Sequence, residues 1–172
     1  MFSRRHASGS NDDRLVDLEG KMAAIGRSQA VVEFNLDGTI IDANPNLLST
    51  LGYTLEEIRG AHHRMFMDPA EAASPDYAAF WRELNEGRFL ARKFRRLAKG
   101  GREVWLQASY NPVFGPDGRP TKVIKLAVDI TEAEQQAGRN EADRLAAERA
   151  QTALVEALAG VLGRLSGGDL TA

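Results

Sequence analysis

The sequence predicts an α+β fold in which a five-stranded antiparallel sheet carries short helices over one face. Two β-branched segments flank an Asp37-Gly38 pair, a pattern typical of a β-hairpin. After Gly87, three further extended segments follow, separated by links of hairpin length. Helical segments occupy the chain between these two groups of strands. A chain of 172 residues is long enough for one such domain with helical extensions.

The N-terminal segment divides into a polar tail and a helix. Residues 1–10 are small, polar and basic, so we expect a flexible tail there. Residues 11–26 are predicted to form a short amphipathic helix. Its apolar stripe must be covered, either by the domain's own sheet or by the same helix of a second chain. The stripe consists of Leu15, Leu18, Met22 and Ile25.

The first two strands are predicted at residues 31–36 and 39–44. Between them, Asp37-Gly38 is expected to form a two-residue type I′ turn. Both central positions of that turn have positive φ, which Asp-Gly tolerates.

Two short helices should follow this hairpin. Asn44 precedes a proline and is predicted to begin a helix that ends at Gly52. Thr54 and Glu57 have the spacing of a capping box, which predicts another short helix ending at Gly60.

The central segment, residues 61–76, is expected to be irregular because prolines interrupt it. An aromatic-rich helix is predicted from Pro75 until Gly87. The remaining extended segments should form an antiparallel meander, because the links between them have the length of hairpin turns. These three predicted strands are residues 88–97, 102–114 and 121–130.

The C-terminal segment, residues 132–172, is predicted to be a long signalling helix. It is rich in Ala, Glu, Gln, Arg and Leu and contains no Pro. Its apolar residues recur in steps of four and three, which favours a coiled coil over a lone surface helix. The seam consists of Ala147, Leu154, Leu158, Val161 and Leu165.

Composition argues against several classes of function. With 22 Lys and Arg against 24 Asp and Glu, the net charge is -2, so we expect no nucleic-acid partner. The sequence contains no Cys, which fits a reducing compartment, and no apolar run reaches the roughly 18 residues of a membrane span. We therefore expect a cytoplasmic protein without a membrane segment. No Gly-x-Ser-x-Gly, phosphate-binding loop or His-Glu-x-x-His motif occurs, so we expect no enzyme and predict no catalytic residues.

The order of elements and several landmark residues resemble the PAS family of sensory domains over residues 29–131. The landmarks are Phe34-Asn35-Leu36-Asp37-Gly38, Ile41-Asp42-Ala43-Asn44, Leu51-Gly52-Tyr53, Glu57-Ile58-Arg59-Gly60 and Asp129-Ile130-Thr131. Other segments are similar, more narrowly, to PAS domains that precede the signalling regions of methyl-accepting chemotaxis proteins. These segments are His62-His63-Arg64-Met65-Phe66, Phe80-Trp81 and residues 104–112. The resemblance implies a PAS fold and a sensory role in a chemotaxis-type receptor.

The last residues, 165–172, resemble the start of a HAMP-type signalling segment. The resemblance implies a homodimer and a longer receptor, in which a downstream methyl-accepting region receives the signal through the C-terminal helix. A sensor placed before a histidine kinase or a diguanylate cyclase is one alternative. A PAS dimerisation module without any ligand is the alternative from a different functional class.

His62 and His63 are the candidate metal ligands. Some PAS domains hold haem in the cleft between sheet and helices, and imidazole is a good axial ligand to haem iron. The resemblance therefore implies haem b as a cofactor, with only one of the two adjacent histidines facing the cleft. The alternative is that these histidines cap a short helix or bond to the backbone in an irregular segment.

Apolar and aromatic residues are further candidates for a cofactor pocket. They are Met65, Phe66, Phe80, Trp81 and Trp105, together with the two histidines. The alternative for each of them is ordinary core packing. FAD is another candidate cofactor, although the chain lacks the reactive cysteine of the photoactive flavin subtype, and a domain without cofactor remains a third alternative.

Asp129, Ile130 and Thr131 join the last predicted strand to the C-terminal helix. The family resemblance implies that these residues transmit the signal by passing strain from sheet to helix. Asp or Thr can cap the new helix while Ile anchors it. A plain N-cap explains the same residues without signalling.

Overall fold

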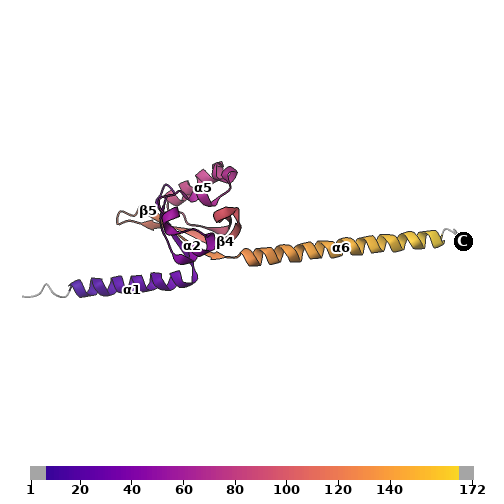
Figure 1. Cartoon of the computed structure of the whole chain (residues 1–172), viewed down its shortest axis with the longest axis horizontal. Helices are drawn as coiled ribbons and strands as arrows, with labels where there is room; N and C mark the ends of the chain where they lie inside the picture. Colours follow the sequence, from indigo (N-terminus) through magenta and orange to yellow (C-terminus); the bar gives the residue numbers. More distant parts are fainter. Residues whose placement is uncertain (1–6, 167–172) are drawn as a thin grey trace, which may run out of the picture. The chain divides into compact units, whose positions relative to one another are not determined.

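The computed structural model describes residues 7–166, with side-chain burial from residue 11 to residue 164. The chain divides into two compact units, one up to Thr131 and one from Glu132 onward. The first unit contains the sheet and the shorter helices, and the second is formed by helix α6 (Figure 1).

The first unit is built on one five-stranded antiparallel sheet with the strand order β2-β1-β5-β4-β3. This sheet confirms the predicted α+β fold class. The first and last strands, β1 and β5, pair at its centre, where Val32 lies opposite Lys125. That pairing joins the predicted hairpin to the predicted meander. The strands are β1 (Ala30–Phe34), β2 (Ile40–Ala43), β3 (Leu90–Leu97), β4 (Glu103–Phe114) and β5 (Pro120–Asp129).

Short helices cover the inner face of this sheet, with α2 packed on β1 and α5 packed on β4 and β5. The segment predicted to be irregular contains two single-turn helices, η1 and α4. The helices are α2 (Pro45–Leu51), α3 (Leu55–Ile58), η1 (His63–Phe66), α4 (Pro69–Ala72), α5 (Pro75–Asn85) and η2 (Lys99–Gly101).

The predicted helix caps are present. The Asn44 side chain accepts a hydrogen bond from the Leu47 amide, and Gly52 ends α2 with a φ of 74°. The Glu57 carboxylate accepts a hydrogen bond from the Thr54 amide at 2.9 Å, as a capping box requires. Local sequence therefore defines both ends of α2 and the beginning of α3.

The turn between β1 and β2 differs from the predicted two-residue type I′ turn. The Gly38 amide donates to the Asn35 carbonyl at 2.9 Å, so the central residues of the turn are Leu36 and Asp37. Gly38 follows them with a φ of 89°. Asp37 accepts a hydrogen bond from the Thr39 amide at 2.9 Å. The prediction was wrong because the Asp37 side chain stabilises a longer loop that ends in a left-handed glycine.

Helix α1 spans Ala7–Ser28, so its backbone includes residues 7–10, which the sequence assigned to the tail. Its C-terminal end is fastened to the domain by two side-chain amides. Asn44 and Asn46 donate to the Gly26 carbonyl at 3.1 and 2.9 Å. The predicted apolar stripe is exposed in the single chain, with Leu15 at 56% and Leu18 at 48%.

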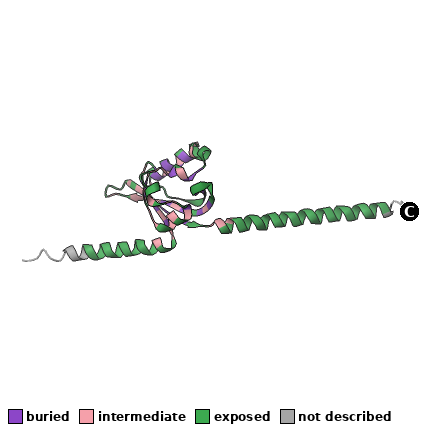
Figure 2. Cartoon of the chain, viewed as in Figure 1, coloured by how far each residue is buried: buried purple, intermediate pink, exposed green. Residues whose placement is uncertain are grey.

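The core lies on one face of the sheet, because buried and more exposed residues alternate along the central strands. On β4 the inward residues include Leu106 and Tyr110, and on β5 they include Val123 and Ala127. Figure 2 shows buried residues in the sheet and in α5. Lys125 occupies an inward position of β5 and is also buried, although it carries a charge.

Helix α6 spans Thr131–Ser166 and is exposed along nearly all of the length for which burial is described (Figure 2). Its exposed apolar side chains include Leu154, Leu158 and Val161 of the predicted seam. The HAMP-like resemblance falls on residues 165–172, of which 167–172 lie outside the described residues. Between residues 7 and 166, no helix combines the length and the apolar composition of a membrane span.

Candidate functional site

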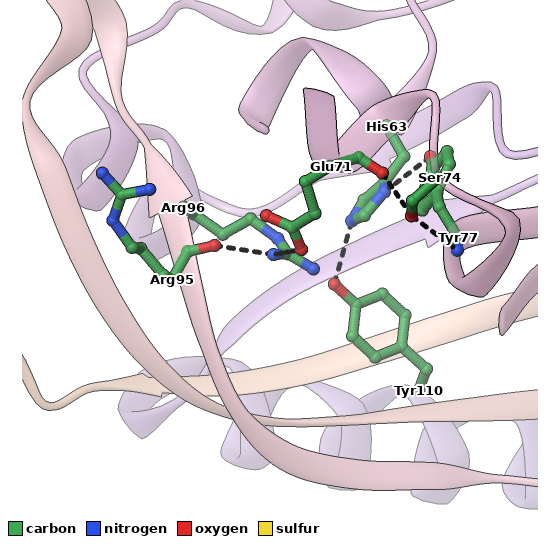
Figure 3. A network of polar contacts seen from close by, with 7 residues as sticks. All are labelled: His63, Glu71, Ser74, Tyr77, Arg95, Arg96 and Tyr110. Atoms are coloured by element: carbon green, nitrogen blue, oxygen red, sulfur yellow. Dashed lines mark hydrogen bonds and ion pairs between the residues drawn. The ribbon is translucent and has the colours of Figure 1, made fainter. Parts of the chain in front are cut away.

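His63 lies at the centre of the core and is fully buried, with 0% of its surface exposed. Helix η1 carries it beneath α5, and both of its ring nitrogens have partners (Figure 3). Nδ1 is 3.0 Å from the Tyr77 hydroxyl, and Nε2 is 2.9 Å from the Tyr110 hydroxyl. Because a neutral imidazole has one donor and one acceptor nitrogen, it can satisfy both hydroxyl groups.

An aromatic shell surrounds this imidazole. Six aromatic rings have centroids within 6.4 Å of the His63 ring. They belong to Phe34, Phe66, Tyr77, Phe80, Trp81 and Tyr110. The structure thus brings together four predicted site residues, namely His63, Phe66, Phe80 and Trp81. Met65 is half-buried and packs against the same core.

Trp105 lies elsewhere. It is on the outward side of β4 and is only half-buried, and its indole N–H donates to the Glu103 carboxylate at 2.8 Å. The sequence grouped it with the pocket residues because of its residue type. Strand alternation instead directs it away from the core.

His62 is half-buried and lies nearer the surface than His63. Its Nδ1 accepts a hydrogen bond from the Arg64 amide at 3.1 Å, which caps helix η1. Its ring packs so closely on Gly38 that a Cβ at that position would lie 2.9 Å from it. His62 also lines a groove of about 600 Å³ together with Asp37. His62 therefore has the helix-capping role that the sequence offered as the alternative to haem binding.

Two buried cations, Arg96 and Lys125, complete the inner surface. Arg96 is 3% exposed and Lys125 is 2% exposed, whereas no Asp or Glu side chain is buried among residues 11–164. The Lys125 ammonium lies 5.0 Å from the centre of the Tyr110 ring. Neither residue was among the predicted site residues. Strand alternation could have indicated that both side chains point inward. Arg96 follows the apolar Phe94 by two residues, and Lys125 follows the apolar Val123 by two residues.

Burial and these cations control the protonation of the site. Burial lowers the pKa of His63 well below its ordinary value of 6.5, and the charges of Arg96 and Lys125 lower it further. Burial also lowers the pKa of Lys125, which the nearby Tyr110 hydroxyl partly counteracts. For Tyr110, burial raises the pKa, but the two cations together outweigh it and the net shift is downward. At neutral pH, His63 is therefore an uncharged bridge between two tyrosines.

The geometry does not fit haem iron bound to His63. A neutral imidazole binds iron through an unprotonated nitrogen, and here each nitrogen is occupied by a tyrosine hydroxyl. The Tyr77 hydroxyl occupies the space between the two imidazoles, 3.0 Å from His63 Nδ1 and 3.5 Å from His62 Nδ1. In the described part of the chain, no group of three or more His, Asp or Glu residues could hold a metal ion.

The predicted transmission residues form a compact junction between β4, β5 and α6. The Ile130 amide donates to the Trp105 carbonyl at 2.8 Å, and the Trp105 amide donates to the Thr131 hydroxyl at 2.9 Å. The Asp129 carboxylate accepts a hydrogen bond from the Thr131 amide at 2.9 Å. The first residue of α6 is therefore fastened to the backbone of β4. Trp105 therefore contributes to this junction through its backbone N–H and carbonyl groups.

A family model described as "PAS fold" matches residues 26–135, which is more than half of the chain. The chain belongs to the PAS family. The match covers the sheet, the helices around His63 and the junction at Thr131. The predicted PAS fold is thereby confirmed.

Two curated relatives match a large part of this chain. The biofilm dispersion protein BdlA of Pseudomonas aeruginosa is 44% identical over 116 residues, which are 67% of this chain and 28% of that protein. The bacterioopsin transcriptional activator of Halobacterium salinarum is 27% identical over 148 residues, which are 77% of this chain and 21% of that protein. The chain thus spans about a quarter of the length of these relatives.

Solved structures have the same fold. A PAS domain from Colwellia psychrerythraea has a TM-score of 0.58 at 24% identity, covering 67% of this chain and 98% of that one. An RNA-binding light-oxygen-voltage receptor has a TM-score of 0.63 at 23% identity, covering 86% of this chain and 40% of that one. At these identities the similarity shows the PAS fold alone.

Proposed function

We propose that this chain is the sensory part of a cytoplasmic chemotaxis-type receptor, in which the PAS domain binds a small ligand and transmits its state through α6. One observation carries the proposal. The buried polar cluster of His63, Tyr110 and Lys125 lies on or against β4 and β5, the two strands that hold the first residue of α6. A change in this cluster therefore acts on the strands that hold the start of the output helix.

The path from the cluster to the helix is short. Tyr110 and Lys125 are opposite each other in the β4–β5 ladder, and Leu106 lies opposite Asp129 in the same ladder. Four residues of extended strand, roughly 13 Å, separate Lys125 from Asp129. A small shift between β4 and β5 would change the hydrogen bonds that Trp105 makes with Ile130 and Thr131. Such a shift requires a ligand with different affinities for two arrangements of the domain.

The buried charges support a binding role. A charged group in the core is unfavourable unless it is paired, and such groups tend to occur at functional sites. The sequence similarity to chemotaxis receptors and the 44% identity to a protein named for biofilm dispersion support a role in signalling. The downstream partner would be a HAMP and methyl-accepting region. The proposal gives the chain no catalytic role, because the sequence contains no Gly-x-Ser-x-Gly, phosphate-binding loop or His-Glu-x-x-His motif.

Ligand-free dimerisation is the second candidate, because the aromatic shell fills the space around His63. An absorption spectrum of the protein purified from its natural host separates the cofactor alternatives. A Soret band would indicate haem b, and a flavin spectrum would indicate FAD, because a light-oxygen-voltage domain of similar fold has been solved with a flavin analogue. A colourless protein would be consistent with a small metabolite as the ligand or with no ligand.

The coupling can be tested with two matched substitutions on one strand. Lys125→Met removes the buried charge, whereas Lys122→Met changes a half-exposed lysine paired with Glu33 on the outward side of β5. We expect Lys125→Met to alter amide hydrogen exchange around residues 130–137, because the cluster and the junction share β4 and β5. Lys122→Met should leave that exchange as in the unmodified chain.

Mass spectrometry of the full chain after timed exchange provides this measurement. Unchanged exchange at the junction in Lys125→Met, with altered exchange confined to the centre of the sheet, would refute transmission through β5. An equal response to both substitutions would also count against it, since the response would then not depend on the buried cluster.

The proposal also includes a homodimer through α6. Leu158 is 55% exposed in the single chain, and burying such residues against a second copy would stabilise a coiled coil. We expect Leu158→Glu to lower the dimer affinity by at least about tenfold, because a carboxylate at the seam must be desolvated. Light scattering over a range of concentrations measures this affinity.

Thr152→Glu is the matched control for that substitution. It adds the same charge on the opposite side of the helix, since residue 152 lies about 140° around the helix from the seam. It should dimerise as the unmodified chain does. A monomeric unmodified chain, or a Leu158→Glu variant that dimerises normally, would contradict pairing through this seam.

A further inference from the structure

A groove of about 740 Å³ lies between α5 and the edge strand β3, on the opposite side of Tyr77 from the His62 groove. Apolar side chains form part of its wall, including Met67, Phe80 and Phe94. Basic side chains of β3 form another part, including Arg92 and Arg96. The groove therefore presents an apolar surface next to cations of β3, and the acids Glu71, Asp76 and Glu83 of α4 and α5 also line it.

Two guanidinium groups approach the same aromatic ring in this groove. The Cζ atoms of Arg92 and Arg96 lie 5.0 and 4.8 Å from the centre of the Phe94 ring. Strand alternation places all three residues on one side of β3. Because both groups lie against one ring, a single small molecule could contact both of them. Their mutual repulsion would be relieved by an anion.

Arg96 is the residue that most clearly lacks a counter-charge. It is 3% exposed, and its Nε has no hydrogen-bond partner among the described residues. Its Nη1 donates to the Arg95 carbonyl at 2.6 Å. A buried guanidinium normally has its N–H groups satisfied and its charge paired. In Arg96, Nη1 has an acceptor, but Nε has none.

Glu71 is the acid nearest to Arg96, but it is a weak partner. Its Oε1 is 3.6 Å from Arg96 Nη1, and its side chain is 48% exposed (Figure 3). An ion pair with one solvated member at this distance contributes little. Arg95, which also lines the groove, already has a partner in Glu103. Glu71 could therefore be displaced by a ligand that brings a better oxyanion.

We propose that this groove binds a small organic anion, with its carboxylate or phosphate group on Arg92 and Arg96 and its apolar body against Phe80 and Phe94. The inference rests on the proposed sensory function and assigns the chemical class of its ligand. Guanidinium groups bind both oxyanions through paired N–H donors, which explains the use of Arg rather than Lys.

Occupation of this groove would reach the central cluster through charge. The Arg96 charge acts on both His63 and Tyr110, and it helps to hold the pKa of each group below its ordinary range. An anion on Arg96 would weaken that effect. The ligand would thereby change the hydrogen bonds of the His63 bridge without contacting it.

Calorimetric titration of the full chain tests the inference with three probes of the same size class. Benzoate and phenyl phosphate carry the two candidate oxyanions, and benzamide is their neutral counterpart. We expect at least one anion to bind about tenfold more tightly than benzamide, because hydrogen bonds between charged groups are stronger than those to a neutral amide. The tighter of the two identifies the oxyanion.

Substitutions then locate the bound anion. Arg92→Gln changes an exposed residue, so the domain should remain folded while anion affinity falls about tenfold. Arg96→Met should weaken binding in the same way. Glu71→Gln should tighten binding several-fold because it removes the competing carboxylate. Arg119→Gln removes one positive charge outside the groove and should leave the affinity unchanged.

Two outcomes would overturn the inference. One is that neither anion binds more tightly than benzamide, and the other is that Arg92→Gln binds the anion as well as the unmodified chain does. Both outcomes test only the chemical class of the ligand and not the sensory function. The exchange comparison of Lys125→Met with Lys122→Met addresses transmission separately, so failure of the anion site is distinguishable from failure of the sensory function.

Discussion

Phe80→Ala is expected to lower the free energy of unfolding by about 3–5 kcal/mol, the usual range for removing a buried phenylalanine. Phe80 is 5% exposed, and its ring contacts those of His63, Tyr110 and Phe94. The substitution leaves a cavity beside the histidine that neighbouring rings cannot fill without leaving their own contacts. It therefore removes both buried apolar area and the wall that separates the central cluster from the groove.

Chemical denaturation followed by circular dichroism measures this loss. Phe89→Ala is the matched control, because Phe89 is 68% exposed and should change stability by less than about 1 kcal/mol. If Phe80→Ala were no more destabilising than Phe89→Ala, the tightly packed aromatic core described for the PAS domain would be incorrect. An intermediate loss with enhanced binding of apolar dyes would indicate that the cavity is retained and open.

His63 should give the protein a marked sensitivity to acid. Its pKa in the folded protein is depressed well below 6.5 by burial and by the two buried cations. The unfolded chain therefore binds a proton on this residue at a higher pH than the folded chain does. The stability that uncharged His63 contributes is fully present above about pH 6.5. It is lost as the pH falls from there through the folded-state pKa. The loss should approach about 1.4 kcal/mol for each pH unit.

His63→Gln should remove this part of the pH dependence, although it also changes the stability at neutral pH. The informative quantity is the slope of the free energy of unfolding between pH 7 and pH 5, compared between the variant and the unmodified chain. His62→Gln is the comparison, because His62 is half-buried and Asp37 partly offsets the lowering of its pKa. A His63→Gln variant with the original slope would show that the buried imidazole becomes charged without a large penalty.

Much of the fold follows from short-range features of the sequence. Asn44 and Gly52 define α2, because one side chain caps its first turn and the other residue adopts the left-handed conformation that ends it. The strands of the meander are predictable since each link is a short turn. The positions of His62 and Pro75 at helix starts follow the same local rules. These elements depend on contacts within a few residues.

The candidate site was predictable only in part. The segment at 62–66 and the aromatic pair at 80–81 were identified by resemblance and by residue type, and most of these side chains do meet around His63. Trp105 was misplaced because an aromatic residue type does not reveal which side of a strand it occupies. Arg96 and Lys125 were not predicted as site residues because a cation is expected to be exposed, and only the register of β3 and β5 places them inward.

The sequence by itself therefore determined the approximate positions of most strands and helices, that they form a PAS domain, and which segments carry the exit junction and the apolar seam of α6. Tertiary structure alone decided that β1 pairs with β5, that His63 rather than His62 enters the core, and that two cations lie beneath the helices. The physical reason is the range of the interactions. Caps and turns are local, whereas burial and charge compensation depend on residues that come together only when distant strands pair.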